Sequence, residues 1–287
     1  MSDFPEMDGA FEIAAPAKTN LWLRVVGKRE DGFHEIETRM VALTLADQLK
    51  LKWREDEEIV LRCSDESLPT GEENLVVRAV RALEAEVGKT LAVSIDLEKH
   101  VPSGAGLGGG SSDAAAVLRA LNEMAALELS EEKLAAIGAT IGSDVPFFIY
   151  NRPCDCSGRG EIVTPLNEEA PVLRLFLIKP AFGISAAWAY QHWSSSGEYE
   201  GFAYAEQEMG WGAMGNDLER PVFEKFPLLG EMKSWLRSQK GVEASLLSGS
   251  GSTMLAVLED GADGEALDKA AKERYGENCW TSLCRTS

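Results

Sequence analysis

The sequence predicts an α+β fold made of two domains, and three observations support this prediction. The chain has 287 residues, about twice the length of one typical compact domain. Hydrophobic residues make up 45% and charged residues 26% of the chain, as in globular proteins with sizeable cores. Strand-like and helix-like segments are mixed without regular alternation, which favours antiparallel sheets over a parallel sheet.

The first 165 residues form the first predicted domain. A loop is expected over 27–34, where the sequence is polar and contains two glycines. Alternating or β-rich runs predict strands at 11–26 with an interruption, 40–45, 48–53, 59–63 and 90–97. Apolar residues at helical spacing predict helices at 74–87, 112–127 and 133–140, and Ser130 followed by two glutamates is typical of a helix start.

The second predicted domain covers residues 166–287. Its pattern predicts a strand at 172–178, a helix at 186–193, an acidic glycine-rich loop up to 215, and helices up to 239. Two strands are then expected on either side of a glycine turn at 248–251, followed by a helix and a strand. The stretch 194–215 is rich in aromatic residues, which fits either a mobile cover or a loop that buries its own aromatic cluster.

Charge and composition exclude several classes of protein. Lys and Arg number 28 against 47 Asp and Glu, so the formal net charge is −19, which argues against a nucleic-acid or anionic membrane surface. No apolar run reaches the length of a membrane span, and the acidic N-terminus differs from a secretion signal, so we expect a cytoplasmic protein. The five scattered cysteines lack zinc-site spacing and are expected to be reduced structural thiols.

A glycine-rich segment between a predicted strand and a predicted helix carries the clearest functional signal. Without bulky side chains its backbone amides can approach a ligand closely, and the following helix adds a positive dipole end suited to phosphates. Three other readings of the segment fit less well. A flexible linker would not lie between two regular elements, and a Walker loop needs a lysine before its final serine or threonine, which is missing here. The segment also matches the dinucleotide-binding fingerprint in form, but the acidic residue that should end a second strand is missing. The predicted ATP-binding residues are Pro102, Ser103, Gly104, Ala105, Gly106, Leu107, Gly108, Gly109, Gly110, Ser111 and Ser112.

This segment resembles the nucleotide-phosphate motif of the superfamily of galactokinase, homoserine kinase, mevalonate kinase and phosphomevalonate kinase (GHMP kinases). Residues 15–21, Ala-Pro-Ala-Lys-Thr-Asn-Leu, resemble the first motif of that family, and residues 247–253 resemble its third. Four more stretches, 27–34, 142–148, 158–165 and 215–219, are similar to the kinases that phosphorylate 4-diphosphocytidyl-2-C-methylerythritol. The resemblance implies an N-terminal domain of the ribosomal-protein S5 type, a ferredoxin-like C-terminal domain, and an active site in the cleft between them.

The resemblance implies two catalytic residues, Lys18 and Asp144. Asp144 would accept the proton of the attacking hydroxyl as general base, and Lys18 would keep Asp144 ionised and lower the charge cost near the γ-phosphate. Each residue has a simpler reading. Asp144 precedes Pro146 and can be a helix N-cap, and Lys18 can be a solvated lysine on a strand.

The resemblance also implies the residues that bind the acceptor substrate, namely Asn20, Phe33 and His34. His34 is a candidate reader of the cytosine edge, against the alternative of a surface histidine. The family more often has tyrosine at the position of Phe33, so an aromatic face is kept while a hydroxyl is lost. Thr19 also departs from the aliphatic residue usual in the family.

A second glycine turn is expected to close the phosphate site through Gly249, Ser250 and Gly251, although a plain hairpin turn is a rival reading. ATP chemistry implies Mg²⁺, and Ser111 or Ser112 can supply a hydroxyl to it or can instead cap the following helix. The expected reaction is ATP-dependent phosphorylation of the 2-hydroxyl of 4-diphosphocytidyl-2-C-methylerythritol in the non-mevalonate isoprenoid route. A sister kinase for homoserine, mevalonate or a sugar, and a catalytically silent nucleotide sensor, are the alternatives.

Overall fold

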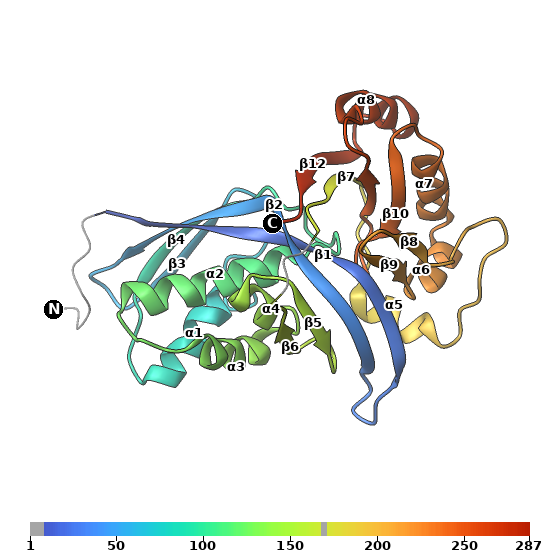
Figure 1. Ribbon diagram of the computed structural model, residues 1–287. Helices are drawn as coiled ribbons and strands as arrows, with labels where there is room; N and C mark the ends of the chain where they lie inside the picture. The colour runs from blue at the N-terminus through green and yellow to red at the C-terminus, as the bar shows by residue number, and fades with distance from the viewer. Residues whose placement is uncertain (1–8, 168–170) are drawn as a thin grey trace.

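Two β-sheets and the helices packed on them form the computed structural model, which describes residues 9–167 and 171–287 (Figure 1). In the larger sheet the strand order is β3-β4-β2-β1-β9-β8, and β5 pairs with β2 and with β6. Its strands are β1 (Phe11–Lys28), β2 (His34–Trp53), β3 (Ile59–Cys63), β4 (Val93–Glu98), β5 (Cys154–Ser157), β6 (Ile162–Pro165), β8 (Gln207–Met209) and β9 (Gly212–Asn216).

The smaller sheet is antiparallel throughout, with the order β10-β11-β7-β12. Its strands are β7 (Arg174–Lys179), β10 (Val242–Leu247), β11 (Met254–Leu258) and β12 (Trp280–Arg285). The mixture of two sheets with flanking helices confirms the predicted α+β fold class.

The helices divide into two groups, one for each sheet (Figure 1). Those that pack with the larger sheet are α1 (Leu75–Val87), α2 (Gly109–Met124), α3 (Glu131–Ile141) and α4 (Val145–Tyr150). Those of the second half are α5 (Ala186–Trp193), α6 (Glu219–Lys225), α7 (Pro227–Arg237) and α8 (Gly264–Tyr275). In the part of the chain that the structure describes, no helix has both the length and the apolar character needed to span a membrane.

Three sequence predictions about the elements were wrong in detail. The two short strands expected at 40–45 and 48–53 are one long strand, β2. The helix expected from 112 begins at Gly109, inside the glycine-rich segment. The expected loop up to 215 contains the hairpin of β8 and β9, and β9 pairs in parallel with β1 through Trp22 with Gly215 and Leu23 with Asn216. A segment from the second half of the sequence thus extends the larger sheet.

The interruption expected in the first strand takes the form of β-bulges in β1. The register with β2 shifts between Pro16 and Lys18 and again between Asn20 and Trp22. Bulges of this kind redirect side chains, and Lys18, Thr19 and Asn20 are buried at consecutive positions. The bulges therefore present polar side chains at a place where regular alternation would put half of them on the other face.

An apolar core also lies between the two sheets and joins the halves of the chain. It brings Ala17 of β1 and Leu107 of the glycine-rich segment together with Leu175 and Leu177 of β7 and Leu255 of β11. The C-terminal residues continue this connection, because the amide of Ser287 donates to the carbonyl of Ala42 at 3.0 Å. The cleft described next is built on this shared core.

Candidate active site

Two cavities of about 570 Å³ and 470 Å³ lie side by side in the cleft between the halves of the molecule. The smaller is lined by the glycine-rich segment, and the larger by the β1–β2 hairpin and α5. Both are lined by Lys18, Ser111, Asp144, Ala186 and Ser250, so the two spaces meet at these residues. Such a junction suits a reaction in which a group passes from a molecule in one cavity to a molecule in the other.

Lys18 and Asp144 face each other at this junction. Lys18 Nζ lies 3.7 Å from Asp144 Oδ2, and the lysine side chain is 6% exposed against 35% for the aspartate. Lys18 Nζ also donates to Asn20 Oδ1 at 2.9 Å, and Asn20 Nδ2 donates to Thr38 Oγ1 at 2.7 Å. These contacts fix the ammonium while the carboxylate stays open to the cavities, so Lys18 is not the solvated lysine of the simpler reading.

Asp144 occupies the N-cap position of α4, but its side chain makes no capping hydrogen bond. The backbone there follows from the neighbouring sequence, because Pro146 in the first turn supports a helix start. The carboxylate is therefore free to point at Lys18 rather than at the helix amides.

The glycine-rich segment lines the smaller cavity and leads into α2. Gly108 is the N-cap of α2 with φ +73°, a left-handed conformation that glycine adopts without strain. A Cβ on Gly108 would lie 2.8 Å from the ring of Phe148 and 3.1 Å from Lys18 Cγ, so no larger residue fits. The amides at the start of an α-helix lack partners within the helix, and with the positive end of the helix dipole they suit an anion.

Nine of the eleven predicted loop residues line this cavity, and two do not. Leu107 is buried in the core between the sheets, where its carbonyl accepts a hydrogen bond from the amide of Lys18 at 2.9 Å. Ser112 is buried in the first turn of α2. The lining residues are Pro102, Ser103, Gly104, Ala105, Gly106, Gly108, Gly109, Gly110 and Ser111.

The turn between β10 and β11 packs directly on the glycine-rich segment. The turn joins two antiparallel strands, as the hairpin interpretation predicted, and two of its residues also line the larger cavity. A Cβ on Gly251 would lie 2.1 Å from the amide nitrogen of Gly106, and one on Gly249 would lie 3.2 Å from Lys18 Nζ. Gly249 lines the larger cavity and Ser250 lines both, whereas Gly251 lines neither cavity and allows this close backbone packing.

Aromatic side chains form the far wall of the larger cavity. His34 is 6% exposed, and its ring stacks on Tyr190 with centroids 5.8 Å apart. Burial lowers the pKa of His34, aided by the nearby charge of Lys28, so the imidazole is neutral near pH 7. Phe33 is 51% exposed, and the guanidinium of Arg159 lies 4.7 Å from its ring centroid. A planar ring with polar edges can be held here by stacking and hydrogen bonding together.

A buried ionic cluster lies next to the glycine-rich segment, where a Cβ on Gly109 would be 3.3 Å from Lys99 Nζ. Lys99 Nζ contacts the carboxylates of Asp47 and Asp113, the latter at 2.7 Å, and Lys99 and Asp113 also line the smaller cavity. Asp47 accepts hydrogen bonds from the backbone amides of His100 and Val101. Burial, opposed by the Lys99 ammonium and reinforced by the adjacent Asp47 carboxylate, raises the pKa of Asp113 to about 7.

The structure thus brings Lys18, Asn20, Phe33, His34 and Asp144 together around one cleft. Sequence reasoning missed two residues that line the larger cavity. Arg159 lies within the quoted stretch 158–165, which gave it a signal without a role, and Tyr190 lies in a predicted helix with no signal of its own.

Two family models match the chain, one described as the GHMP kinases N terminal domain over residues 74–152 and one as the GHMP kinases C terminal over residues 202–277. A 4-diphosphocytidyl-2-C-methyl-D-erythritol kinase of Syntrophotalea carbinolica is 39% identical over 270 residues, which are 91% of this chain and 94% of that protein. The kinase of the same name from Methylacidiphilum infernorum is 38% identical over 94% of both chains.

Solved structures give the same result. The crystal structure of a 4-(cytidine 5'-diphospho)-2C-methyl-D-erythritol kinase superposes with a TM-score of 0.78 at 33% identity, covering 96% of this chain and all of that one. Homoserine kinase from Cytophaga hutchinsonii is 15% identical with a TM-score of 0.69, over 100% of this chain and 97% of that one, and shows the shared fold alone. With its paired cavities and these relatives, the chain belongs to the 4-diphosphocytidyl-2-C-methyl-D-erythritol kinase family of the GHMP kinases.

Proposed function

We propose that this kinase transfers the γ-phosphoryl group of ATP to the 2-hydroxyl of 4-diphosphocytidyl-2-C-methyl-D-erythritol, a step of the non-mevalonate isoprenoid route. The observation that carries the proposal is the meeting of two cavities at Lys18 and Asp144. One cavity has the glycine-rich lining that suits the phosphates of ATP, and the other has the aromatic wall that suits a cytosine ring.

The chemistry assigned to the junction is proton acceptance beside a fixed cation. Asp144 accepts the proton of the attacking hydroxyl, and the Lys18 ammonium lies 3.7 Å from that carboxylate. The Lys18 ammonium lowers the cost of negative charge on the group in transit, because phosphoryl transfer depends mainly on positioning and charge neutralisation. Asn20 holds the ammonium in place for this task.

The acceptor is oriented by the wall opposite the junction. Neutral His34 offers one ring donor and one acceptor to the edge of the cytosine, and Phe33 and Tyr190 offer ring faces. Arg159 places a cation in the same cavity, where it offsets the negative charge of the substrate diphosphate. These local donors attract the anion despite a chain charge of −19, since salt screens fields beyond roughly 8–10 Å.

Mg²⁺ accompanies ATP and would supply charge neutralisation on the phosphate oxygens. In phosphate sites this ion keeps several waters and takes one or two protein oxygens, so a protein cage is not required. Within residues 9–167 and 171–287 no cluster of three or more His, Cys, Asp or Glu is arranged to hold a metal. Ser111 lines both cavities. Ser111 is therefore the residue proposed to reach the ion, rather than the buried Ser112.

The test is product formation with magnesium-ATP and a panel of the cytidyl alcohol, homoserine, mevalonate and galactose, with phosphorylated products identified by mass. Turnover of the cytidyl alcohol alone supports the proposal, and turnover of another member would replace the substrate. Asp144→Asn should keep ATP binding and lose most turnover. Near-normal turnover in this variant would remove Asp144 from the mechanism.

A further inference from the structure

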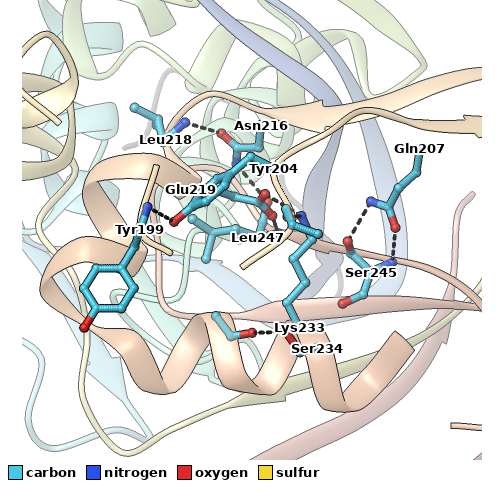
Figure 2. Close-up of polar contacts among 12 residues, drawn as sticks. Tyr199, Tyr204, Gln207, Asn216, Leu218, Glu219, Lys233, Ser234, Ser245 and Leu247 are labelled. Carbon is cyan, nitrogen blue, oxygen red and sulfur yellow. Dashed lines mark hydrogen bonds and ion pairs between the residues drawn. The ribbon is translucent and has the colours of Figure 1, made fainter. Parts of the chain in front are cut away.

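Asn216, the last residue of β9, holds the glycine turn between β10 and β11 by its side chain. Its Nδ2 donates to the carbonyl of Leu247 at 2.8 Å and to that of Gly249 at 2.7 Å, and its Oδ1 accepts from the amide of Leu218 at 2.9 Å (Figure 2). The residue is 7% exposed, and both of its donors are used on the turn and the strand before it. The stretch 215–219 that contains it received no role from the sequence.

The backbone around Asn216 is tied at the same time to β1, the strand that carries Lys18. Asn216 pairs with Leu23 in the parallel ladder, and the amide of Asp217 donates to the carbonyl of Leu23 at 3.0 Å. The carboxylate of Asp217 then accepts from the amide of Val25 at 2.8 Å. One short segment therefore links the strand of Lys18 to the glycine turn.

The position of that turn matters at the site because Gly249 lies against the ammonium. A Cβ on Gly249 would be 3.2 Å from Lys18 Nζ and 3.4 Å from Asn20 Oδ1, and the next residue, Ser250, lines both cavities. The carbonyl of Gly249 is the group that Asn216 holds. Release of this carbonyl would remove the tie between β9 and the centre of the turn, and the contacts of Ser248 Oγ with Thr19 Oγ1 at 3.1 Å and with the carbonyl of Gly106 at 3.2 Å would then hold the turn at its first residue alone.

A second buried contact supports the same strand end. Glu219 accepts from the amide of Leu247 at 3.0 Å and pairs with Lys233 at 2.6 Å, and Lys233 donates to the carbonyl of Ala203 at 2.8 Å (Figure 2). Glu219 holds β10 one residue before the turn, while Asn216 alone among these residues contacts Gly249.

We propose that Asn216 is a positioning residue for phosphoryl transfer, one that fixes the Gly249 turn relative to Lys18 through its two amide donors. The inference rests on the proposed kinase reaction. Small displacements at a transfer site lower the rate of the chemical step far more than they weaken the binding of either substrate. Loss of the donors should accordingly lower kcat and leave the KM for the cytidyl alcohol nearly unchanged.

The chain offers a matched control in Gln207 on β8. Its Nε2 donates to the carbonyl of Ser245 at 2.8 Å, and its Oε1 accepts from the amide of Ser245 at 3.0 Å (Figure 2). Gln207 is thus a second buried side-chain amide that binds β10, but it does so at Ser245, before the turn. Truncation of Gln207 removes similar hydrogen bonds without freeing Gly249.

The experiment compares Asn216→Ala, Asn216→Ser and Gln207→Ala with the wild type in steady-state kinetics with the cytidyl alcohol, after their unfolding midpoints are measured. Both Asn216 variants should lose at least about tenfold in kcat, with the KM for the alcohol within threefold, while Gln207→Ala keeps the wild-type kcat. A kcat within twofold of the wild type in the Asn216 variants, or an equal loss in Gln207→Ala, overturns the inference.

Hydrogen exchange of the backbone amides of residues 248–253 tests the same contact without substrate. It is measured on Asn216→Ser, which keeps one hydrogen-bond donor, in case Asn216→Ala does not fold. Exchange should be faster in Asn216→Ser and unchanged in Gln207→Ala, and equal exchange overturns the inference. If the wild type forms no product, the proposed reaction fails, and this exchange measurement still decides the role of Asn216 in holding the turn.

Discussion

The close packing of the glycine-rich segment on the β10–β11 turn predicts a large difference between two similar substitutions, Gly106→Ala and Gly104→Ala. Both glycines have left-handed backbones, with φ +79° and +63°. A Cβ on Gly106 would lie 2.1 Å from the carbonyl oxygen of Ser248 and 2.7 Å from the amide nitrogen of Gly251, whereas one on Gly104 would meet only the Cα of Gly183 at 3.5 Å. The pair therefore separates the clash from the backbone strain.

The magnitudes follow from these contacts. The left-handed backbone costs an L-residue about 1–2 kcal/mol at either position. Overpacking against backbone that cannot move aside adds about 1–3 kcal/mol at Gly106 only. We expect Gly104→Ala to lower the free energy of unfolding by about 1–2 kcal/mol and Gly106→Ala by about 2–5 kcal/mol.

Urea titration followed by tryptophan fluorescence measures the difference. With an m-value of about 3 kcal/mol/M, the extra 1–3 kcal/mol moves the midpoint of Gly106→Ala about 0.3–1 M below that of Gly104→Ala. The two variants must keep the same m-value for the comparison to hold. Indistinguishable midpoints would refute the packing of the segment on the turn as the source of the requirement for glycine.

Three further predictions concern the cavities and the ionic cluster next to the glycine-rich segment. His34→Ala should raise the KM for the cytidyl alcohol roughly tenfold, because it removes one hydrogen bond of about 1.4 kcal/mol in a buried site. The KM for ATP should stay within about twofold. Equal rises in both KM values would contradict the role of His34 in binding the alcohol. Arg159→Leu removes the cation over Phe33 and should raise the same KM about twofold to fivefold, from about 0.5–1 kcal/mol, and an unchanged KM would exclude the contact from substrate binding. Burial raises the pKa of Asp113 from its ordinary value of 3.8 to about 7. Between these two pH values the folded protein keeps a proton on Asp113 that the unfolded chain has released, so the free energy of unfolding falls as pH rises toward 7. Asp113→Asn should flatten that fall, measured as unfolding midpoints at pH 5 and pH 8, and an unaltered slope would rule out Asp113 as its source.

Two helices were predicted closely from the sequence. Residues 74–87 gave α1, whose first turn is capped by the side chain of Asn74, and residues 186–193 gave α5. In both cases the local pattern and the tertiary contacts favour the same structure, so no distant residue had to be known.

The errors arose where a distant contact overrides the local pattern. The predicted break in β2 fell at Asp47, a charged residue that is 0% exposed. Its carboxylate accepts hydrogen bonds from Lys99 and from two backbone amides, all more than fifty residues away in the sequence. The start of α2 was placed too late because glycine is a poor helix former, while Gly109 and Gly110 are helical as part of the packed segment.

The candidate site shows the same division. Lys18, Asn20, His34 and Asp144 lie in motifs with a recognisable order, and the structure places all four around the larger cavity. Their roles in the reaction stay predictions. The stacking of Tyr190 on His34 joins residues 156 positions apart, and no local sequence pattern reports such a pair.

The apolar core shared by the two sheets constrains how this enzyme can move. Leu107 of the glycine-rich segment is 1% exposed and packs with Leu175, Leu177 and Leu255 of the smaller sheet. A hinge motion that opened the whole cleft would expose this contact to water, at about 25 cal/mol for each Å² of apolar surface. Substrate entry and product release through motion of individual segments at the rim would avoid this cost, because the floor of the site would stay packed.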